Sequence, residues 1–257
     1  MEFKVLGCYG AEMPGYQLSS FLIDKRLLLD AGAVSATLKL KDQVKVDYLL
    51  LTHVHLDHIK GISFLADNVY GLRKEPIIIA SIEPVISDLK KYLLNDILWP
   101  DFTRLPDTNS PVVVFEAMDE EIPQPLGKYT VRAVKVNHTV AAVGFFVTGK
   151  GGTLLYTGDT GPTDRVWEVA MDYPDLKAVI VETSFPNKYQ EIADFSGHLT
   201  PQILKVELEK LDTGQDSIIP VYLYHAKPQY LREISQEVRA IKRRKIFILK
   251  QGKDYYL

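Results

Sequence analysis

The sequence of 257 residues contains a single cysteine, Cys8, and no long apolar run. One cysteine excludes a disulfide within the chain, which suits a reducing compartment. We expect Cys8 to be a buried, inert thiol, because it follows a short strand-like run. No stretch approaches the roughly 18 apolar residues that a membrane span needs, and Met1 to Cys8 does not resemble a secretory leader. We therefore expect a cytoplasmic protein without a membrane segment.

An excess of basic charge is also missing. The net charge is −3 and the pI is about 6.1, so no overall field draws the chain to nucleic acid or to an anionic membrane. The basic run from Lys242 to Lys245 ends a predicted helix, and we interpret it as a solvated helix end. Hydrophobic residues make up 46% and charged residues 25% of the chain, which is typical of a globular protein with one large core.

Short apolar runs rich in β-branched residues predict strands along the whole chain. These runs are Phe3–Leu6, Ser20–Ile23, Arg26–Leu29, Tyr48–Leu51, Ile77–Ala80, Val112–Phe115, Thr130–Val136, Gly144–Val147, Thr153–Tyr156, Ala178–Val181, Ile218–Tyr222 and Lys245–Leu249. Amphipathic segments between them predict helices at Ile59–Ala66, Val85–Leu94, Thr163–Met171, Pro201–Leu211 and Gln229–Arg243. Thr200 is the expected N-cap of the helix that starts at Pro201.

Strands in runs, followed by strands that alternate with helices, favour an α/β fold with two mixed sheets packed face to face and helices outside. We therefore predict a four-layer αββα sandwich. Residues 1–257 are expected to form one domain of two related halves, roughly 1–140 and 141–257, because the spacing from Asp30 to His53 equals that from Asp159 to Glu182. Asn95 to Pro111, with three prolines, is predicted to be a long structured loop or lid.

A cluster of four candidate metal ligands follows one of the buried strands. His53 and His55 lie two residues apart in an extended segment, so their side chains point the same way. Asp57 and His58 come next and begin a predicted helix. Four such side chains at the end of a buried strand would be costly in a dry interior unless a metal satisfied them. The cluster therefore predicts a metal site.

The other three histidines each stand at the end of a predicted strand or near a helix start: His138, His198 and His225. A lone histidine in such a place is more often structural than a ligand. Beside a metal cluster the balance reverses, and we expect them to belong to the same site.

The order of these residues resembles that of the metallo-β-lactamase superfamily: an acid after an early strand, His-x-His-x-Asp-His, a His, an Asp and a final His. The matching residues are Asp30, His53, His55, Asp57, His58, His138, Asp159 and His225. The resemblance implies that His53, His55 and His138 hold one metal and that Asp57, His58 and His225 hold the other. Asp159 would bridge the two metals, and Asp30 would bond the loop that presents the ligands. Nitrogen and oxygen ligands without a thiolate favour zinc, with manganese or iron as alternatives.

Within that superfamily, further motifs are similar to those of class II cyclic-nucleotide phosphodiesterases. They are His53 to Gly61, Trp99 to Phe102, Glu182 to Pro186 and Ser196 to Pro201. Glu182 with His198 also resembles the pair found in branches that process tRNA 3′ ends, where this histidine is a proton donor. Two features depart from these families: the loop from Gly10 to Gly15 is less rich in glycine than in class II enzymes, and the chain lacks a long Gly- and Pro-rich tRNA-binding arm.

The resemblance implies a binuclear phosphodiesterase that converts 3′,5′-cyclic AMP or GMP to the 5′-monophosphate by means of a metal-bridging hydroxide. Asp57 and Asp159 would act in catalysis as metal-binding carboxylates. His198 would protonate the leaving 3′-oxygen, held and kept cationic by Glu182. The expected partner is a small cyclic nucleotide rather than nucleic acid, and a homodimer is expected from the resemblance alone.

Residues outside the metal cluster could contact such a substrate. The loop with Trp99 and Phe102 is our candidate for the wall against which a base packs, with core packing of Trp99 as the alternative. Lys227 could face a phosphate, although we prefer a solvated lysine.

Three other functions are left open. The first is an RNA or DNA phosphodiesterase on the same fold. The second is an ester, lactone or lactam hydrolase, which would have no use for the pair of Glu182 and His198. The third is a metal-holding binding or sensor protein without turnover.

Overall fold

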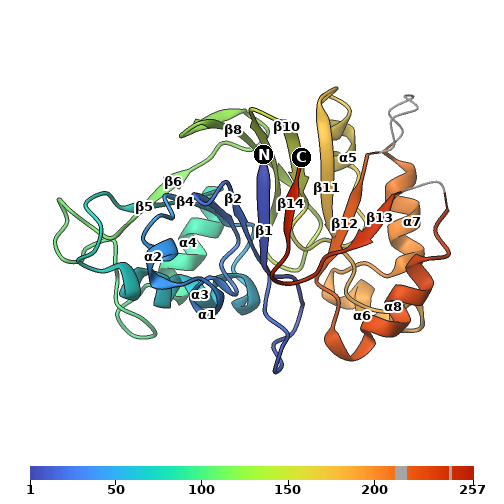
Figure 1. Ribbon diagram of the computed structural model, residues 1–257, viewed down its shortest axis with the longest axis horizontal. Coiled ribbons are helices and arrows are strands. Elements are labelled where there is room, and N and C mark those ends of the chain that lie inside the picture. Colours follow the sequence, from blue (N-terminus) through green and yellow to red (C-terminus); the bar gives the residue numbers. More distant parts are fainter. Residues whose placement is uncertain (212–218, 243–244) are drawn as a thin grey trace.

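Two seven-stranded β-sheets pack face to face in the computed structural model, which describes residues 1–211, 219–242 and 245–257 (Figure 1). The first sheet has the order β14 (Asp254–Tyr256), β1 (Glu2–Gly7), β2 (Ser20–Ile23), β3 (Leu27–Leu29), β4 (Tyr48–Leu50), β5 (Ile77–Ser81) and β6 (Val113–Ala117). The second has the order β13 (Ile246–Ile248), β12 (Val221–Tyr224), β11 (Leu176–Glu182), β10 (Gly152–Tyr156), β9 (Val143–Gly149), β8 (Tyr129–Lys135) and β7 (Gln124–Leu126). Both sheets are mixed, because antiparallel pairing at one end gives way to parallel pairing from β3 to β6 and from β10 to β13.

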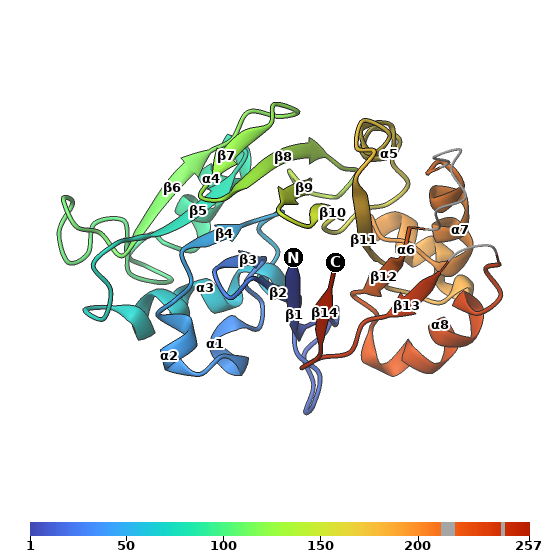
Figure 2. The same ribbon diagram turned by 45° about the horizontal axis from the view of Figure 1, so that its top comes forward.

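Helices cover the outer face of each sheet (Figure 2). On the side of the first sheet lie α1 (Val34–Thr37), α2 (Leu40–Gln43), α3 (Leu56–Val69) and α4 (Glu83–Tyr92). On the side of the second lie α5 (Arg165–Ala170), α6 (Gln190–Ser196), α7 (Pro201–Glu209) and α8 (Leu231–Val238), with 3₁₀ turns at η1 (Asn187–Tyr189) and η2 (Pro228–Tyr230). The four-layer sandwich predicted from the sequence is confirmed.

The strands of the second sheet divide their side chains between two apolar layers. In β10, Leu154 and Tyr156 belong to the core between the sheets, whereas Leu155 packs with the helices outside. In β11, Ile180 faces the inner core and Val181 the outer one. This alternation is the period of two that an extended chain imposes. It explains why these strands are apolar throughout.

Several predicted elements differ from those observed. The edge strands β7 and β14 and the short helices α1, α2 and α6 were not predicted. The strand predicted at Ile218–Tyr222 lies at Val221–Tyr224, and Ile218 itself lies outside the described residues. The helix predicted to reach Arg243 ends at Val238, and the middle of the basic run, Arg243 and Arg244, also lies outside them.

Thr200 is the N-cap residue of α7, as predicted, but its hydroxyl lies 2.5 Å from Oε1 of Gln190 and does not cap the helix. The loop at 95–111 is structured, as predicted: Val113 N donates to the Phe102 carbonyl at 3.2 Å, and Val112 N to that of Leu105 at 2.9 Å. Cys8 is buried, and burial raises the pKa of its thiol to about 12. Within the described ranges, no helix is long and apolar enough to cross a membrane.

Candidate metal centre and proton donor

The histidines and acids singled out in the sequence lie at one edge of the two sheets. His53 and His55 follow β4 and lead into α3, with His55 as its N-cap residue. His138 follows β8, Asp159 follows β10, and His225 follows β12. Since parallel strands end at a common edge, residues distant in sequence meet there.

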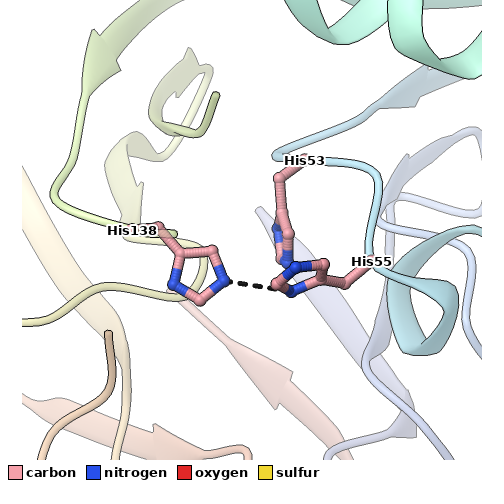
Figure 3. Close-up of side chains that lie close together, drawn as sticks. All are labelled: His53, His55 and His138. Atoms are coloured by element: carbon pink, nitrogen blue, oxygen red, sulfur yellow. Dashed lines mark hydrogen bonds between the residues drawn. The ribbon is translucent and has the colours of Figure 1, made fainter. Parts of the chain in front are cut away.

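Three histidines form the first group of candidate ligands (Figure 3). His53 and His55 come from the segment after β4, and His138 approaches them from the second sheet. One ring nitrogen from each lies within 4.8 Å of the others. Nε2 of His138 is 3.1 Å from Nδ1 of His55. This group contains the residues that the sequence assigned to one metal.

The second group contains Asp57, His58, Asp159 and His225, whose ligand atoms also lie within 4.8 Å of one another. Oδ2 of Asp159 is 3.2 Å from Nε2 of His58, 3.1 Å from Nε2 of His225 and 3.8 Å from Nε2 of His53. Asp159 therefore lies between the two groups, as a bridging carboxylate must.

Hydrogen bonds on the far side of four rings fix which nitrogen is free. In His53, Nδ1 lies 2.9 Å from the Thr52 hydroxyl, and in His58 it lies 2.7 Å from the Asp30 carboxylate. The corresponding acceptors are the Gly197 carbonyl at 2.9 Å for His138 and the Ser184 hydroxyl at 2.7 Å for His225. Because the hydroxyls of Thr52 and Ser184 donate to carboxylates, they accept from the ring N–H. Each Nε2 therefore faces the cluster and is the ring nitrogen that can present a lone pair to a metal.

Three of these inward-facing atoms are buried and have no hydrogen-bond partner among the described residues: Nε2 of His53, Nε2 of His58 and Oδ2 of Asp159. Leaving such groups unsatisfied costs about 1–3 kcal/mol each, and more when they are charged. Imidazole nitrogens and carboxylate oxygens are the ligands that divalent transition metals bind. The residues therefore fit a pair of divalent cations.

Electrostatics within the cluster point the same way. Burial, with the neighbouring His58 second, lowers the pKa of His53 well below its usual value, so its lone pair is free. Burial also lowers the pKa of His55 and of His138. For Asp159, burial acts to raise the pKa, but His225 and His58 outweigh it and keep the carboxyl ionised. At His58 burial acts to lower the pKa, but the carboxylates of Asp159, Asp30 and Asp57 outweigh it and raise the pKa well above its usual value. The cluster therefore favours a positive charge, which a metal would supply in place of the proton.

Asp30 supports the cluster from below. It is fully buried, with a φ of 52°, and its carboxylate accepts from the Thr52 backbone N–H at 2.8 Å and from Nδ1 of His58 at 2.7 Å. The Tyr156 hydroxyl donates to the same carboxylate at 2.6 Å. Asp30 thus bonds the segment that carries the ligands, as expected from the resemblance.

Glu182 and His198 form a buried pair beside the cluster. Nδ1 of His198 lies 2.6 Å from Oε1 of Glu182, and the side chains are 9% and 0% exposed. The His198 ring stacks on His225, with centroids 5.1 Å apart and an interplanar angle of 24°. Burial alone would lower the pKa of His198, but the Glu182 carboxylate outweighs it and raises this pKa. The arrangement therefore favours the protonated form of the His198 imidazole.

Side chains expected to meet a substrate differ from the sequence-based prediction. Phe102 is 3% exposed and packs in the core, so it offers no free face to a base. Trp99 is half-buried, and its ring meets Phe64 edge-on at 5.1 Å. Our preference for a solvated Lys227 was wrong, since its ammonium is partly buried and donates to the Gly10 carbonyl at 2.5 Å.

Four supporting residues were missed: Thr52, Tyr156, Ser184 and Tyr224. The Tyr224 hydroxyl donates to Oδ1 of Asp159 at 3.2 Å and leaves Oδ2 facing His58 and His225. Three of the four adjoin or lie near predicted site residues, since Thr52 precedes His53, Tyr224 precedes His225 and Ser184 is two residues from Glu182. Tyr156 has no such signal and is found only from the fold.

Comparisons with known proteins agree with this geometry. A family model described as a beta-lactamase superfamily domain matches residues 25–215. An RNase J-like protein from Methanocaldococcus jannaschii is 24% identical over 240 residues, which cover 88% of this chain and 53% of that protein. The chain therefore spans about half the length of this curated relative.

Solved structures show the same fold. Unliganded yeast PDE1 matches with a TM-score of 0.86 at 19% identity, over 100% of this chain and 99% of that chain. The metallo-β-lactamase fold protein YhfI from Bacillus subtilis has a TM-score of 0.79 at 19% identity, over 99% of both chains. The short form of human tRNase Z has a TM-score of 0.69 at 17% identity, over 100% of this chain and 99% of that chain. The match of the family model over most of the chain shows that the protein belongs to the metallo-β-lactamase superfamily.

Proposed function

We propose that the protein is a binuclear phosphodiesterase that hydrolyses 3′,5′-cyclic nucleotides, cyclic AMP or cyclic GMP, to 5′-monophosphates. The observation that carries this proposal is the buried pair of Glu182 and His198, which stacks on the candidate ligand His225. A phosphodiester has a poorly leaving alkoxide that needs a proton, and a cationic imidazole beside the cluster provides one.

Two divalent cations would be held by the two groups of ligands, His53, His55 and His138 on one side and Asp57, His58 and His225 on the other, with Asp159 shared. Bound there, they would supply Lewis-acid charge and a water of lowered pKa, and zinc suits a set of nitrogen and oxygen ligands. We propose that Asp57 and Asp159 act in catalysis by holding these cations.

The chain's own contribution to the chemistry is the proton. His198 Nδ1 donates to Glu182, so in the cationic ring the second proton resides on Nε2. Glu182 is itself held by the Thr160 N–H at 3.1 Å and by the Ser184 hydroxyl at 2.7 Å. Its orientation is therefore fixed, and it keeps His198 turned so that Nε2 can pass its proton to the leaving 3′-oxygen. Glu182 then balances the charge of the imidazolium.

The base of the nucleotide needs an apolar surface near this pair. Trp99 remains our candidate from the sequence alone; its half-buried ring packs edge-on against Phe64, and its Nε1 is buried without a partner among the described residues.

A second candidate is an RNA phosphodiesterase. The likeness to the RNase J-like protein and to human tRNase Z favours it, and the same pair of Glu182 and His198 would serve it. The net charge of −3 gives a polyanion little overall attraction, which is why we prefer a small substrate. We consider an ester or lactam hydrolase a weaker candidate, because the leaving group of an ester or lactam does not require the pair of Glu182 and His198.

Substrate competition distinguishes these functions. The zinc-loaded protein is offered 3′,5′-cyclic AMP, a tRNA precursor and a neutral lactone at equal concentration, and each product is followed by chromatography. We expect the cyclic nucleotide to have the highest kcat/KM. Preferential cleavage of the precursor would replace the proposal with the RNA function, and preferential opening of the lactone would reject phosphodiester chemistry.

A further inference from the structure

Lys227 places a positive charge beside the pair of Glu182 and His198. Its Nζ lies 5.7 Å from the centroid of the Phe185 ring, and that ring is 6.0 Å from the ring of His198. Phe185 therefore neighbours both the ammonium and the proposed proton donor.

Backbone contacts fix where this lysine stands. Lys227 follows the candidate ligand His225 by two residues, and its N–H donates to the Ser184 carbonyl at 3.2 Å. Its ammonium donates to the carbonyl of Gly10 at 2.5 Å. A Cβ on Gly10 would lie 2.6 Å from Nδ1 of His225, so the loop that receives the ammonium packs against the side of the ligand ring that Ser184 bonds.

The ammonium has more donors than the protein satisfies. Lysine offers three N–H groups, and the Gly10 carbonyl takes one of them. Within the part of the chain that the structure describes, no carboxylate oxygen lies within 4.0 Å of this Nζ. Other lysines differ in this respect: Lys60 pairs with Glu12 at 2.5 Å and Lys188 pairs with Glu233 at 2.8 Å.

A partly buried ammonium of this kind suits an anion. Burial lowers the local dielectric and strengthens attraction to a negative oxygen, and the Phe185 ring excludes water from one side of the charge. The carboxylates of the cluster would be taken up by the cations, whereas a phosphoryl group held there would carry further negative oxygens. Such an oxygen would complete the donors of Lys227.

We propose that Lys227 is a substrate-binding residue that takes an anionic phosphoryl oxygen, so that the leaving oxygen faces His198. This inference rests on the proposed function, because it requires a phosphate ester as substrate. The carbonyl of Gly10 aligns the ammonium, and Phe185 forms the apolar side of the subsite.

The test compares Lys227→Met and Lys227→Arg with Lys188→Met, in which the same substitution is made three residues from Phe185 at an exposed, paired lysine. Binding of inorganic phosphate and of 5′-AMP to the zinc-loaded proteins is measured by calorimetry, with metal content and melting temperature measured on the same samples. Hydrogen bonds to charged groups predict a loss of about 10- to 100-fold in phosphate affinity for Lys227→Met. Lys227→Arg should stay within a few-fold of the unaltered protein, and Lys188→Met should not differ from it.

Equal phosphate affinity in Lys227→Met and the unaltered protein, at full metal content, overturns the inference. So does an equal loss in Lys227→Met and Lys227→Arg, since charge would then not be the cause. If Lys227→Met loses metal or has a lowered melting temperature, the phosphate affinities of Lys227→Arg and Lys227→Gln are compared instead. Equal affinities in these two variants then overturn the inference. The binding measurement needs no turnover. A protein that leaves cyclic AMP intact but loses phosphate affinity in Lys227→Met would therefore reject the proposed function and retain the subsite.

Discussion

Asp30 has both an unusual backbone conformation and a buried carboxylate that accepts several hydrogen bonds. Its backbone turns with φ at 52°, a conformation that aspartate and asparagine tolerate better than other residues with a Cβ. Its carboxylate then accepts from Thr52, His58 and Tyr156. A ligand imidazole is thereby held in the tautomer that presents Nε2 to a metal.

Asp30→Asn should therefore weaken metal binding without straining the backbone. The amide cannot accept from all of these donors, so we expect about a 10- to 100-fold loss in zinc affinity. Zinc content after dialysis against graded chelator measures it. The matched control is Asp24→Asn, at another aspartate with positive φ, 45°, which pairs with Lys128 away from the cluster. Equal zinc retention in both variants would contradict the role assigned to Asp30.

The substitution Glu182→Gln removes the negative charge from the pair of Glu182 and His198. Burial alone lowers the pKa of His198 and the Glu182 carboxylate raises it, so loss of that charge must lower the pKa. A general acid works only when protonated, and activity disappears as the pH rises through its pKa. The basic limb of the pH profile of kcat should therefore move to lower pH in Glu182→Gln.

Glu207→Gln is the control for that shift, since Glu207 is also buried but bonds the indole of Trp167 at 2.8 Å. It should keep the basic limb of the unaltered protein. A basic limb that stays in place in Glu182→Gln would show that His198 is not the titrating acid.

At the scale of elements, the sequence predicted strands with a continuous apolar run well, and it missed two edge strands and three short helices that lack such a pattern. Strand β2 was predicted at the observed Ser20–Ile23, because both of its faces are buried and every residue is apolar or small. β7 and β14 are edge strands of three residues each, and β7 includes Pro125. Such strands are specified by their neighbours and carry little pattern of their own.

The residues of the candidate site also differ in how well the sequence marks them. His53 to His58 could be identified from the sequence because the ligands are adjacent in it. His138 and His225 were marked by their places at strand ends, but their division between the two metals, and the roles of Asp30 and Asp159, came only from resemblance to a family. Tyr156 and the true surroundings of Lys227 depend on contacts across the sandwich, which no pattern in the sequence records.

The loop after β1 is an element whose tight packing makes a prediction. A Cβ on Gly10 would meet the His225 carbonyl at 2.5 Å and its ring at 2.6 Å, so Gly10→Ala must displace His225. We expect loss of one of two zinc ions per chain, measured by elemental analysis. Gly161→Ala is the control, because its nearest atoms are 3.6 Å away. Two zinc ions retained in Gly10→Ala would show that the loop does not position this ligand.

For the whole molecule, the ligands come from both sheets, so bound metal should tie the halves of the sandwich together. Metal that binds only the folded chain at 100 times its Kd adds about 2.7 kcal/mol, which corresponds to roughly 5–10 °C in Tm for a chain of this size. Chelation should lower Tm by that amount, as measured by calorimetry, and zinc should restore it. An unchanged Tm would mean that the cluster holds no metal in the folded state. The division into related halves and the homodimer stay predictions.

The central claim is that His198 delivers a proton in phosphodiester hydrolysis beside a metal centre that it does not itself form. The most direct measurement compares the zinc-loaded protein with His198→Ala, following 5′-AMP from 3′,5′-cyclic AMP and zinc content in the same samples. Loss of a general acid predicts about a 100- to 10,000-fold fall in kcat with both zinc ions retained. Loss of zinc along with turnover would make His198 a ligand, and undiminished turnover would remove it from the reaction.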